Sequence, residues 1–219
     1  MKVTAPILPF IASATASCLH GTSLLPRSAD GLVEINSFNY TNTGGPLTWY
    51  GLSEKNFACS KGKHQSPIDI VTEDIDYAAA NSIRFNVPSA DNAKFENLGS
   101  GLAFHFHTPE YRINEEYYPM DVHFVFENSD KAFAVVGLVF ELPYFSNSTP
   151  LFDSVFAHID DIATPGTYTK TDHLDFTALV AHLNSHGIYR YTGSLTTPPC
   201  SEKVAWFLST EPLPLNVQS

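Results

Sequence analysis

Short runs rich in Phe, Val and Ile constrain the fold of this chain more than any other feature of its sequence. They are either wholly apolar or alternate between apolar and polar residues, and Pro, Gly or Asn bounds most of them, as is typical of β-strands. The runs are residues 67–71, 82–87, 102–107, 121–127, 133–142 and 204–209. The sequence therefore predicts a mainly β protein.

One further segment indicates a helix. Apolar residues recur at helical spacing between Phe176 and Leu183. Asp175 can cap the start of this helix, and Gly187 follows where it would end. Residues 17–66 show little regular periodicity, and we expect loops there. No linker divides the chain, so the sequence predicts one domain with one or two short helices.

The chain is acidic, since 23 Asp and Glu residues against 12 Lys and Arg residues give a formal net charge of -11. An acidic surface is repelled by phosphate backbones, and the sequence contains neither a basic patch nor a Gly-rich phosphate-binding loop. We therefore expect no nucleic-acid partner and a small or neutral substrate.

The first 16 residues have the features of a secretory signal peptide. Lys2 is the only charge in this stretch, the residues after it are apolar or small, and Ala14-Thr15-Ala16 supplies the small-x-small pattern of a cleavage site. A membrane anchor is the alternative, but the apolar run is short and contains two prolines. We expect a signal peptide at residues 1–16, a secreted domain at residues 17–219 and no membrane span.

Secretion makes a disulfide plausible among the three cysteines, Cys18, Cys59 and Cys200, and one of the three must be left over. Two Asn-x-Ser/Thr sequences begin at Asn39 and Asn147 and fit a secreted glycoprotein.

Three histidines are arranged so that they could share a metal ion. His105 and His107 alternate with phenylalanine in a predicted strand, so both imidazoles lie on one face. The same alternation, in which every second side chain lies on one face, places Asp121, His123 and Val125 together on one face of the next strand. If the two strands pair as a hairpin, three imidazoles surround one point. Three neutral nitrogen ligands with an open fourth position describe a catalytic zinc site.

The histidine pattern alone leaves other interpretations open. A His-x-His pair on a strand is often only a half-exposed polar face. His105 and His107 followed by Glu110 are also similar to the first motif of cupin-type metal oxygenases, in which we would expect iron. The glycine of the second cupin motif is missing from Tyr118-Pro119-Met120, which counts against this interpretation.

Three motifs carry a resemblance to a known family. They are Gln65-Ser66-Pro67-Ile68-Asp69-Ile70, Phe104-His105-Phe106-His107-Thr108-Pro109 and Gly193-Ser194-Leu195-Thr196-Thr197-Pro198-Pro199-Cys200, in that order. Together with residues 134–137 and Trp206, they resemble α-class carbonic anhydrases of the secreted, fungal or bacterial kind. The resemblance implies a large twisted, mostly antiparallel sheet with a few short helices. It also implies an enzyme that reversibly hydrates carbon dioxide to bicarbonate and a proton.

The resemblance further implies roles for particular residues. His105, His107 and His123 match the ligands of Zn²⁺, whose bound hydroxide attacks carbon dioxide. Thr196 matches a threonine that accepts a hydrogen bond from that hydroxide and donates one to a buried glutamate, here Glu110.

Other positions match the substrate pocket and a structural link. The substrate-binding residues implied by the resemblance are Val125, Val135, Leu195, Thr196, Thr197 and Trp206. Cys59 and Cys200 match the disulfide of secreted members, which leaves Cys18 as the spare thiol. Closing a loop of roughly 140 residues would stabilise the fold by about 4–5 kcal/mol on the chain-entropy model.

The sequence departs from the family pattern in ways that bear on activity. Ser100 stands where a proton-shuttle histidine is usual, and serine does not titrate near neutral pH. Asp121 replaces a longer glutamate that orients the third ligand, and Ala103 replaces a glutamine. Such losses typically cost about 10–100-fold in metal affinity or activity. We therefore expect reduced activity or, as the alternative, a catalytically impaired zinc-binding or interaction protein.

Smaller departures concern the fold. A family segment of about two strands is absent before Phe104, and the chain ends at Ser219, ahead of the family's last strands. Glu110 comes one position early and Tyr111 replaces a histidine. Glu115 stands at a turn position where glycine is usual, which is costly if the backbone φ angle is positive.

Overall fold

The computed structural model describes residues 33–100, 110–142 and 148–215. Several sequence predictions lie outside these ranges, namely the signal peptide, Cys18, the strand at residues 102–107 with Ala103, His105 and His107, and Asn147.

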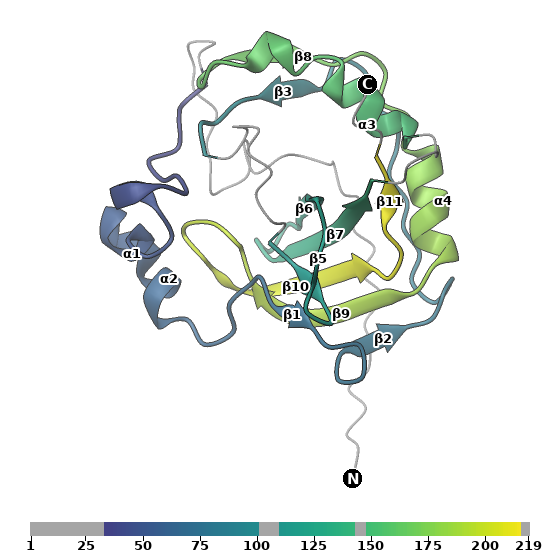
Figure 1. Cartoon of the computed structure of the whole chain (residues 1–219), viewed down its shortest axis with the longest axis horizontal. Coiled ribbons are helices and arrows are strands. Elements are labelled where there is room, and N and C mark those ends of the chain that lie inside the picture. Colours follow the sequence, from purple (N-terminus) through teal and green to yellow (C-terminus); the bar gives the residue numbers. More distant parts are fainter. Residues whose placement is uncertain (1–32, 101–109, 143–147, 216–219) are drawn as a thin grey trace.

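The largest sheet of the described structure has six strands, of which β7 is the central one. Its members are β2 (Asp76–Ala78), β6 (Met120–Glu127), β7 (Phe133–Glu141), β9 (Ile188–Ser194), β10 (Glu202–Ser209) and β11 (Leu213–Pro214). β6 pairs antiparallel with one edge of β7, while β10 and β11 pair in parallel with different parts of the other edge. β9 and then β2 follow antiparallel beyond β10 (Figure 1). The sheet is therefore mixed, with antiparallel pairing predominant.

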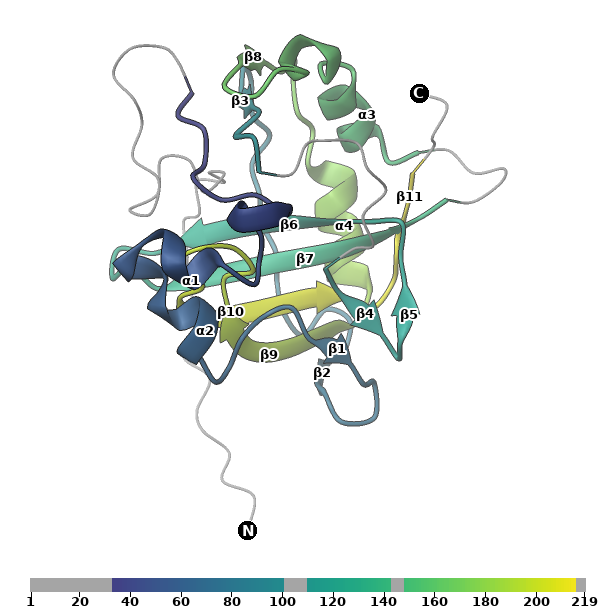
Figure 2. The ribbon, with the colours of Figure 1, turned by 60° about the vertical axis from the view of Figure 1, so that its left-hand side comes forward.

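Smaller elements surround this sheet. The remaining strands are β1 (Asp69–Ile70), β3 (Lys94–Glu96), β4 (Arg112–Ile113), β5 (Glu116–Tyr117) and β8 (Tyr168–Lys170). The helices are α1 (Trp49–Leu52), α2 (Ala58–Lys61), α3 (Pro150–Phe156) and α4 (Thr177–Ser185), with short 3-10 turns at Asn42–Gly44, Glu54–Phe57 and Asp160–Ile162. α1 and α2 lie beside the loop that joins β9 to β10 (Figure 2).

Alternation along β7 divides the hydrophobic core into two parts. Val136 and Leu138 belong to the cluster that includes the apolar face of α4. Val135 and Val139 belong to a second cluster, together with Trp206. Because successive side chains of a strand point to opposite faces, α4 covers one face of the sheet and the second cluster lies on the other.

The elements with the clearest sequence pattern are confirmed. The runs at 121–127, 133–142 and 204–209 form β6, β7 and β10, and the run at 67–71 contains the short β1. The predicted helix is α4, and Asp175 Oδ1 accepts a hydrogen bond of 2.8 Å from the backbone N–H of Thr177 at its start.

The prediction of a strand at residues 82–87 is wrong. Phe85 packs against the α4 side of the core, as an apolar residue in this run should. Its backbone, however, is paired by a side chain: the Phe85 N–H donates to Asn184 Oδ1 at 2.9 Å, and Asn184 Nδ2 donates to the Phe85 carbonyl at 3.1 Å. An amide side chain of α4 thus replaces a neighbouring strand.

The prediction of loops throughout residues 17–66 is also wrong in part, because α1 and α2 lie within it. Each has only four residues, too few for a helical periodicity to be visible in the sequence. Trp49 holds α1 in place, since its indole N–H donates to the carbonyls of Asn39 and Gly44 at 2.9 and 2.8 Å.

Candidate metal centre

His123 lies on β6, directly opposite Gly137 of β7. A Cβ atom at Gly137 would lie 3.3 Å from Leu208 Cδ2, which is a tight contact, and 3.6 Å from His123 Cδ2, which is an ordinary van der Waals distance. The ring meets Trp206 and Tyr111 edge to face, with centroid distances of 4.9 and 5.6 Å. The imidazole is therefore held by packing on two sides.

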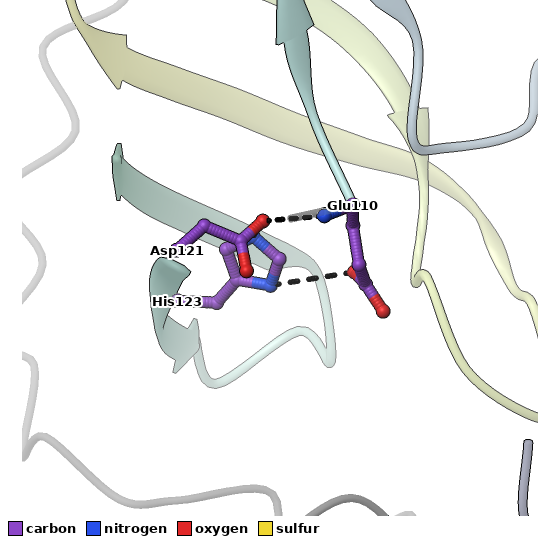
Figure 3. A group of neighbouring side chains, drawn as sticks. All are labelled: Glu110, Asp121 and His123. Atoms are coloured by element: carbon purple, nitrogen blue, oxygen red, sulfur yellow. Dashed lines mark hydrogen bonds and ion pairs between the residues drawn. The ribbon is translucent and has the colours of Figure 1, made fainter. Parts of the chain in front are cut away.

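Two carboxylates flank this imidazole, as Figure 3 shows. His123 Nε2 lies 3.4 Å from Asp121 Oδ2, and Nδ1 lies 3.8 Å from Glu110 Oε2. The backbone N–H of Glu110 donates to Asp121 Oδ2 at 3.2 Å, which ties the two acidic residues together. One ligand atom from each of the three side chains lies within 4.8 Å of the other two, so the group could hold a metal ion.

The donor set fits zinc. Zinc accepts imidazole nitrogen and carboxylate oxygen, and histidine ligands usually have a carboxylate or carbonyl at their other ring nitrogen. Asp121 stands beside Nε2 of His123 in this way, which leaves Nδ1 for a metal. Glu110 Oε2 is buried, and no hydrogen bond to it is completed within the described residues.

The electrostatics of the group also favour a cation. Burial raises the pKa of Glu110, and the charge of Asp121 adds to this shift, while His123 opposes it. Burial lowers the pKa of His123, but the carboxylates of Asp121 and Glu110 outweigh it and raise the pKa above its usual value. Two partly buried acidic groups at one imidazole are stabilised by added positive charge.

Two hydroxyl groups lie at the Glu110 carboxylate. The Tyr40 hydroxyl donates to Glu110 Oε1 at 3.0 Å, and the Tyr40 ring packs edge to face on Trp49 at 5.4 Å. Burial and the charge of Glu110 raise the pKa of Tyr40, so its hydroxyl remains a donor. The Thr196 hydroxyl also lies close to the carboxylate, where it lowers the pKa of Glu110. Sequence reasoning missed Tyr40, which is 70 residues away and gives no motif signal of its own.

The residues expected to line an apolar substrate pocket come together beside His123. Val125 of β6 is opposite Val135 of β7, which is opposite Trp206 of β10. Val135, Trp206 and Leu195 are all buried in the second core cluster, and Val125 packs against it. Three neighbouring strands therefore present one apolar row on the face that carries His123.

A chain of hydroxyl groups supports this wall. Tyr111 is fully buried, and its hydroxyl bonds to that of Tyr191, which bonds to Ser66 Oγ at 2.7 Å. Ser66 and Ser194 exchange two hydrogen bonds, of 2.8 and 3.1 Å, between the hydroxyl of one and the backbone N–H of the other. Ser66 belongs to the first sequence motif, yet the motif alone indicated no role for it.

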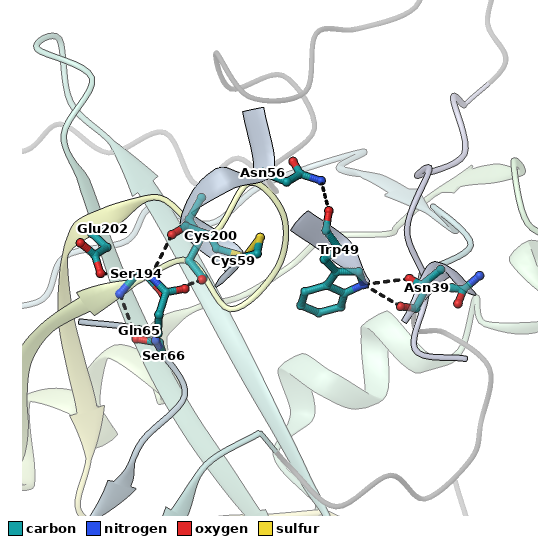
Figure 4. Close-up of a disulfide and its surroundings, with 11 residues drawn as sticks. Asn39, Trp49, Asn56, Cys59, Gln65, Ser66, Ser194, Cys200 and Glu202 are labelled. Carbon is teal, nitrogen blue, oxygen red and sulfur yellow. Dashed lines mark hydrogen bonds between the residues drawn. A yellow bond between two sulfur atoms is a disulfide. The ribbon is translucent and has the colours of Figure 1, made fainter. Parts of the chain in front are cut away.

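The disulfide between Cys59 and Cys200 is present, as the family resemblance predicted. It joins α2 to the loop that carries Thr196 and Thr197 (Figure 4). Within this loop the Cys200 N–H donates to the Thr197 carbonyl at 2.9 Å. Glu202 Oε1 reinforces this link by accepting from the backbone N–H groups of residues 63 and 64 at 2.5 and 2.6 Å. Thr197 itself is partly exposed.

Two departures from the family pattern have visible structural consequences. Ser100 Oγ is bonded to Asn36 Nδ2 at 2.6 Å, so this position carries a fixed hydroxyl. Asn114 and Glu115 form the two-residue turn between β4 and β5 with φ angles of 50° and 67°. The turn therefore requires the positive φ that favours glycine, and Glu115 adopts it at a cost.

The sheet architecture is that of an α-class carbonic anhydrase. Residues 100–219 match the eukaryotic-type carbonic anhydrase family. The chain is 30% identical over 202 residues to a carbonic anhydrase of Pectobacterium atrosepticum, covering 80% of this chain and 77% of that protein. The chain therefore belongs to the carbonic anhydrase family.

Solved structures agree with this assignment. The structure of a fungal α-carbonic anhydrase from Aspergillus oryzae is 55% identical, with a TM-score of 0.76, and the match covers 84% of this chain and 86% of that one. An α-carbonic anhydrase from Thermovibrio ammonificans, solved with the inhibitor sulfanilamide, is 28% identical with a TM-score of 0.64, covering 83% and 86%. The predicted family, fold and enzyme class are confirmed. Among the described residues, no helix is long and apolar enough to cross a membrane.

Proposed function

We propose that this chain is a secreted, zinc-dependent enzyme that reversibly hydrates carbon dioxide to bicarbonate and a proton. The observation that carries the proposal is the partly buried His123 between Asp121 and Glu110, on the face of the sheet that also presents an apolar wall. Family membership supplies the reaction class.

His105, His107 and His123 would hold the zinc ion, with Asp121 orienting the His123 ring through its second nitrogen. Zinc bound there would lower the pKa of a coordinated water to about 7 and so supply a nucleophile at neutral pH. The close contact between Asp121 and Nε2 supports this assignment, because it selects Nδ1 as the metal-facing atom.

Glu110 and Thr196 would orient the nucleophile. A carboxylate only accepts hydrogen bonds, so the Thr196 hydroxyl must donate its single proton to Glu110. The lone pairs of the Thr196 oxygen are then free to accept a hydrogen bond from the attacking group. Tyr40 supports this arrangement, because its bond to Oε1 holds the carboxylate in place.

Carbon dioxide has no charge, so its site needs an apolar wall that excludes water. Val125, Val135, Leu195 and Trp206 would form that wall, beside His123. Thr197, in the loop next to Thr196, would supply a polar contact to the bicarbonate product.

Export of the proton would depend on water and buffer. The Ser100 hydroxyl is engaged by Asn36 and carries no group that titrates near neutral pH. This feature supports the alternative of a slow or impaired enzyme, which is why turnover must be measured against buffer concentration.

We further propose that residues 1–16 are a signal peptide and that residues 17–219 form the secreted domain. The disulfide supports an oxidising compartment. Asn39 is exposed, which is compatible with glycosylation there.

The relay can be tested with Thr196→Val and Glu110→Gln in zinc-loaded protein. Both variants should lose most carbon dioxide hydration, roughly 10²–10⁴-fold, while each retains one zinc ion by mass spectrometry. Full activity in Thr196→Val would contradict the proposed relay, and loss of zinc in Glu110→Gln would instead make Glu110 a direct ligand.

A further inference from the structure

A second pair of imidazoles is carried by the C-terminal end of α4, the helix that packs on the face of the sheet opposite to His123. Figure 1 shows where α4 lies. His182 and His186 are four residues apart, and their ring centroids lie 4.4 Å apart with a 42° angle between the planes. Neither residue takes part in the proposed reaction. Their spacing does not indicate a metalloprotease site, because Leu183 stands where a metalloprotease helix carries glutamate.

The hydrogen bonds of the two rings determine which nitrogens are free. His182 Nε2 lies 3.1 Å from the Glu211 carbonyl oxygen and 3.0 Å from Ser209 Oγ. His186 Nδ1 lies 2.9 Å from the carbonyl oxygen of His182. A carbonyl only accepts, so each of these nitrogens carries a hydrogen. The lone pairs are therefore on Nδ1 of His182 and Nε2 of His186.

This is the arrangement that metal-binding histidines usually have, with the second ring nitrogen tied to a backbone carbonyl. Burial and the neighbouring His186 also lower the pKa of His182, so its ring is neutral and able to bind a metal near neutral pH. The negative charge of the exposed Glu211 lies close enough to oppose that shift and would favour a cation at the pair.

The ring separation fits one shared ion. Imidazole nitrogens bind divalent transition metals at about 2.0–2.1 Å, which places each ring centroid about 3.2 Å from the ion. If the two bonds from the ion to the ring nitrogens met at a right angle, the ring centroids would lie about 4.5 Å apart, close to the observed 4.4 Å. Right angles are characteristic of square-planar or tetragonal Cu²⁺ and Ni²⁺ sites.

We propose that His182 and His186 together bind one divalent transition-metal ion, Cu²⁺ most tightly, at a site separate from the catalytic centre. Water would complete the coordination, because both side chains are only partly buried. The preference for Cu²⁺ follows from the general order of affinity of nitrogen ligands for divalent metals.

The test is a Cu²⁺ titration of tag-free, zinc-loaded protein by calorimetry, with zinc retention checked by mass spectrometry. Wild-type protein should bind one Cu²⁺, whose electron paramagnetic resonance spectrum shows coupling to two imidazole nitrogens. His186→Asn should weaken this binding by about tenfold or more. The matched control is His173→Asn, since His173 is exposed and pairs with Asp91, and it should bind Cu²⁺ as the wild type does.

A second variant, His182→Asn, should also lose the site, with its fold checked by circular dichroism because His182 links α4 to the segment after β10. Equal Cu²⁺ affinity in wild type and His186→Asn would overturn the proposal. So would coupling to a single nitrogen, or the absence of binding by wild-type protein.

Discussion

Removing the disulfide between Cys59 and Cys200 should strongly destabilise the domain. The bond joins residues 141 positions apart, so it closes a loop that includes most of the sheet. In the unfolded chain such a crosslink excludes many extended conformations, and this lowers the entropy gained on unfolding. The change to make is the double variant Cys59→Ala/Cys200→Ala, which leaves no unpaired thiol at this position.

The magnitude follows from the loop length. With 141 residues in the loop, the chain-entropy expression gives about 17 cal/mol/K, or about 5 kcal/mol at 25 °C. Domains of this size are stable by only about 5–15 kcal/mol, so the loss is a large part of the total. The loop with Thr196 and Thr197 would also lose its covalent link to α2, and activity should fall together with stability.

Urea denaturation of the zinc-loaded proteins measures the effect. The double variant should unfold at a much lower urea concentration, with a larger m-value because its unfolded state is less compact. Cys18→Ala is the control and should unfold like the wild type. A difference in unfolding free energy below about 1 kcal/mol between the double variant and the wild type would refute this reasoning.

Three further changes test other parts of the account. Asp121→Ala should weaken zinc binding by about 10–100-fold, measured by chelator competition, because His123 loses the carboxylate at its second nitrogen; unchanged affinity would contradict that role. Gly193→Ala should cost about 1–3 kcal/mol in urea denaturation, because the added Cβ would overlap Ser66 Oγ, and a neutral result would show that the contact relaxes freely. His182 should make stability pH-dependent: burial lowers its pKa from 6.5, so the folded state resists protonation and loses stability as pH falls below 6.5 towards the folded pKa. Compared with His182→Asn, wild-type protein should therefore lose more stability between pH 8 and pH 5, and parallel pH curves would contradict the assignment.

The parts of the fold that the sequence predicted are those with long, regular patterns. β6, β7 and β10 each have eight or nine residues, enough for their apolar character to be recognised. β9 was missed because Arg190, Thr192 and Gly193 interrupt its apolar residues. The two- and three-residue strands depend on their partners rather than on their own composition.

The site was predictable where it depends on strand periodicity. Placing Asp121, His123 and Val125 on one face of β6 needed only the two-residue repeat. Contacts between distant segments left no such signal, and the bond from Tyr40 to Glu110 is an example. The disulfide pairing followed from the family resemblance, because three cysteines alone left the choice of partners open.

The central claim is tested most directly by stopped-flow carbon dioxide hydration with zinc-loaded protein, His123→Ala as control, and a series of buffer concentrations. The account predicts hydration that requires zinc, is lost in His123→Ala and rises with buffer concentration, since no titrating side chain occupies the Ser100 position. A folded, zinc-loaded protein with no hydration above the uncatalysed rate would contradict it.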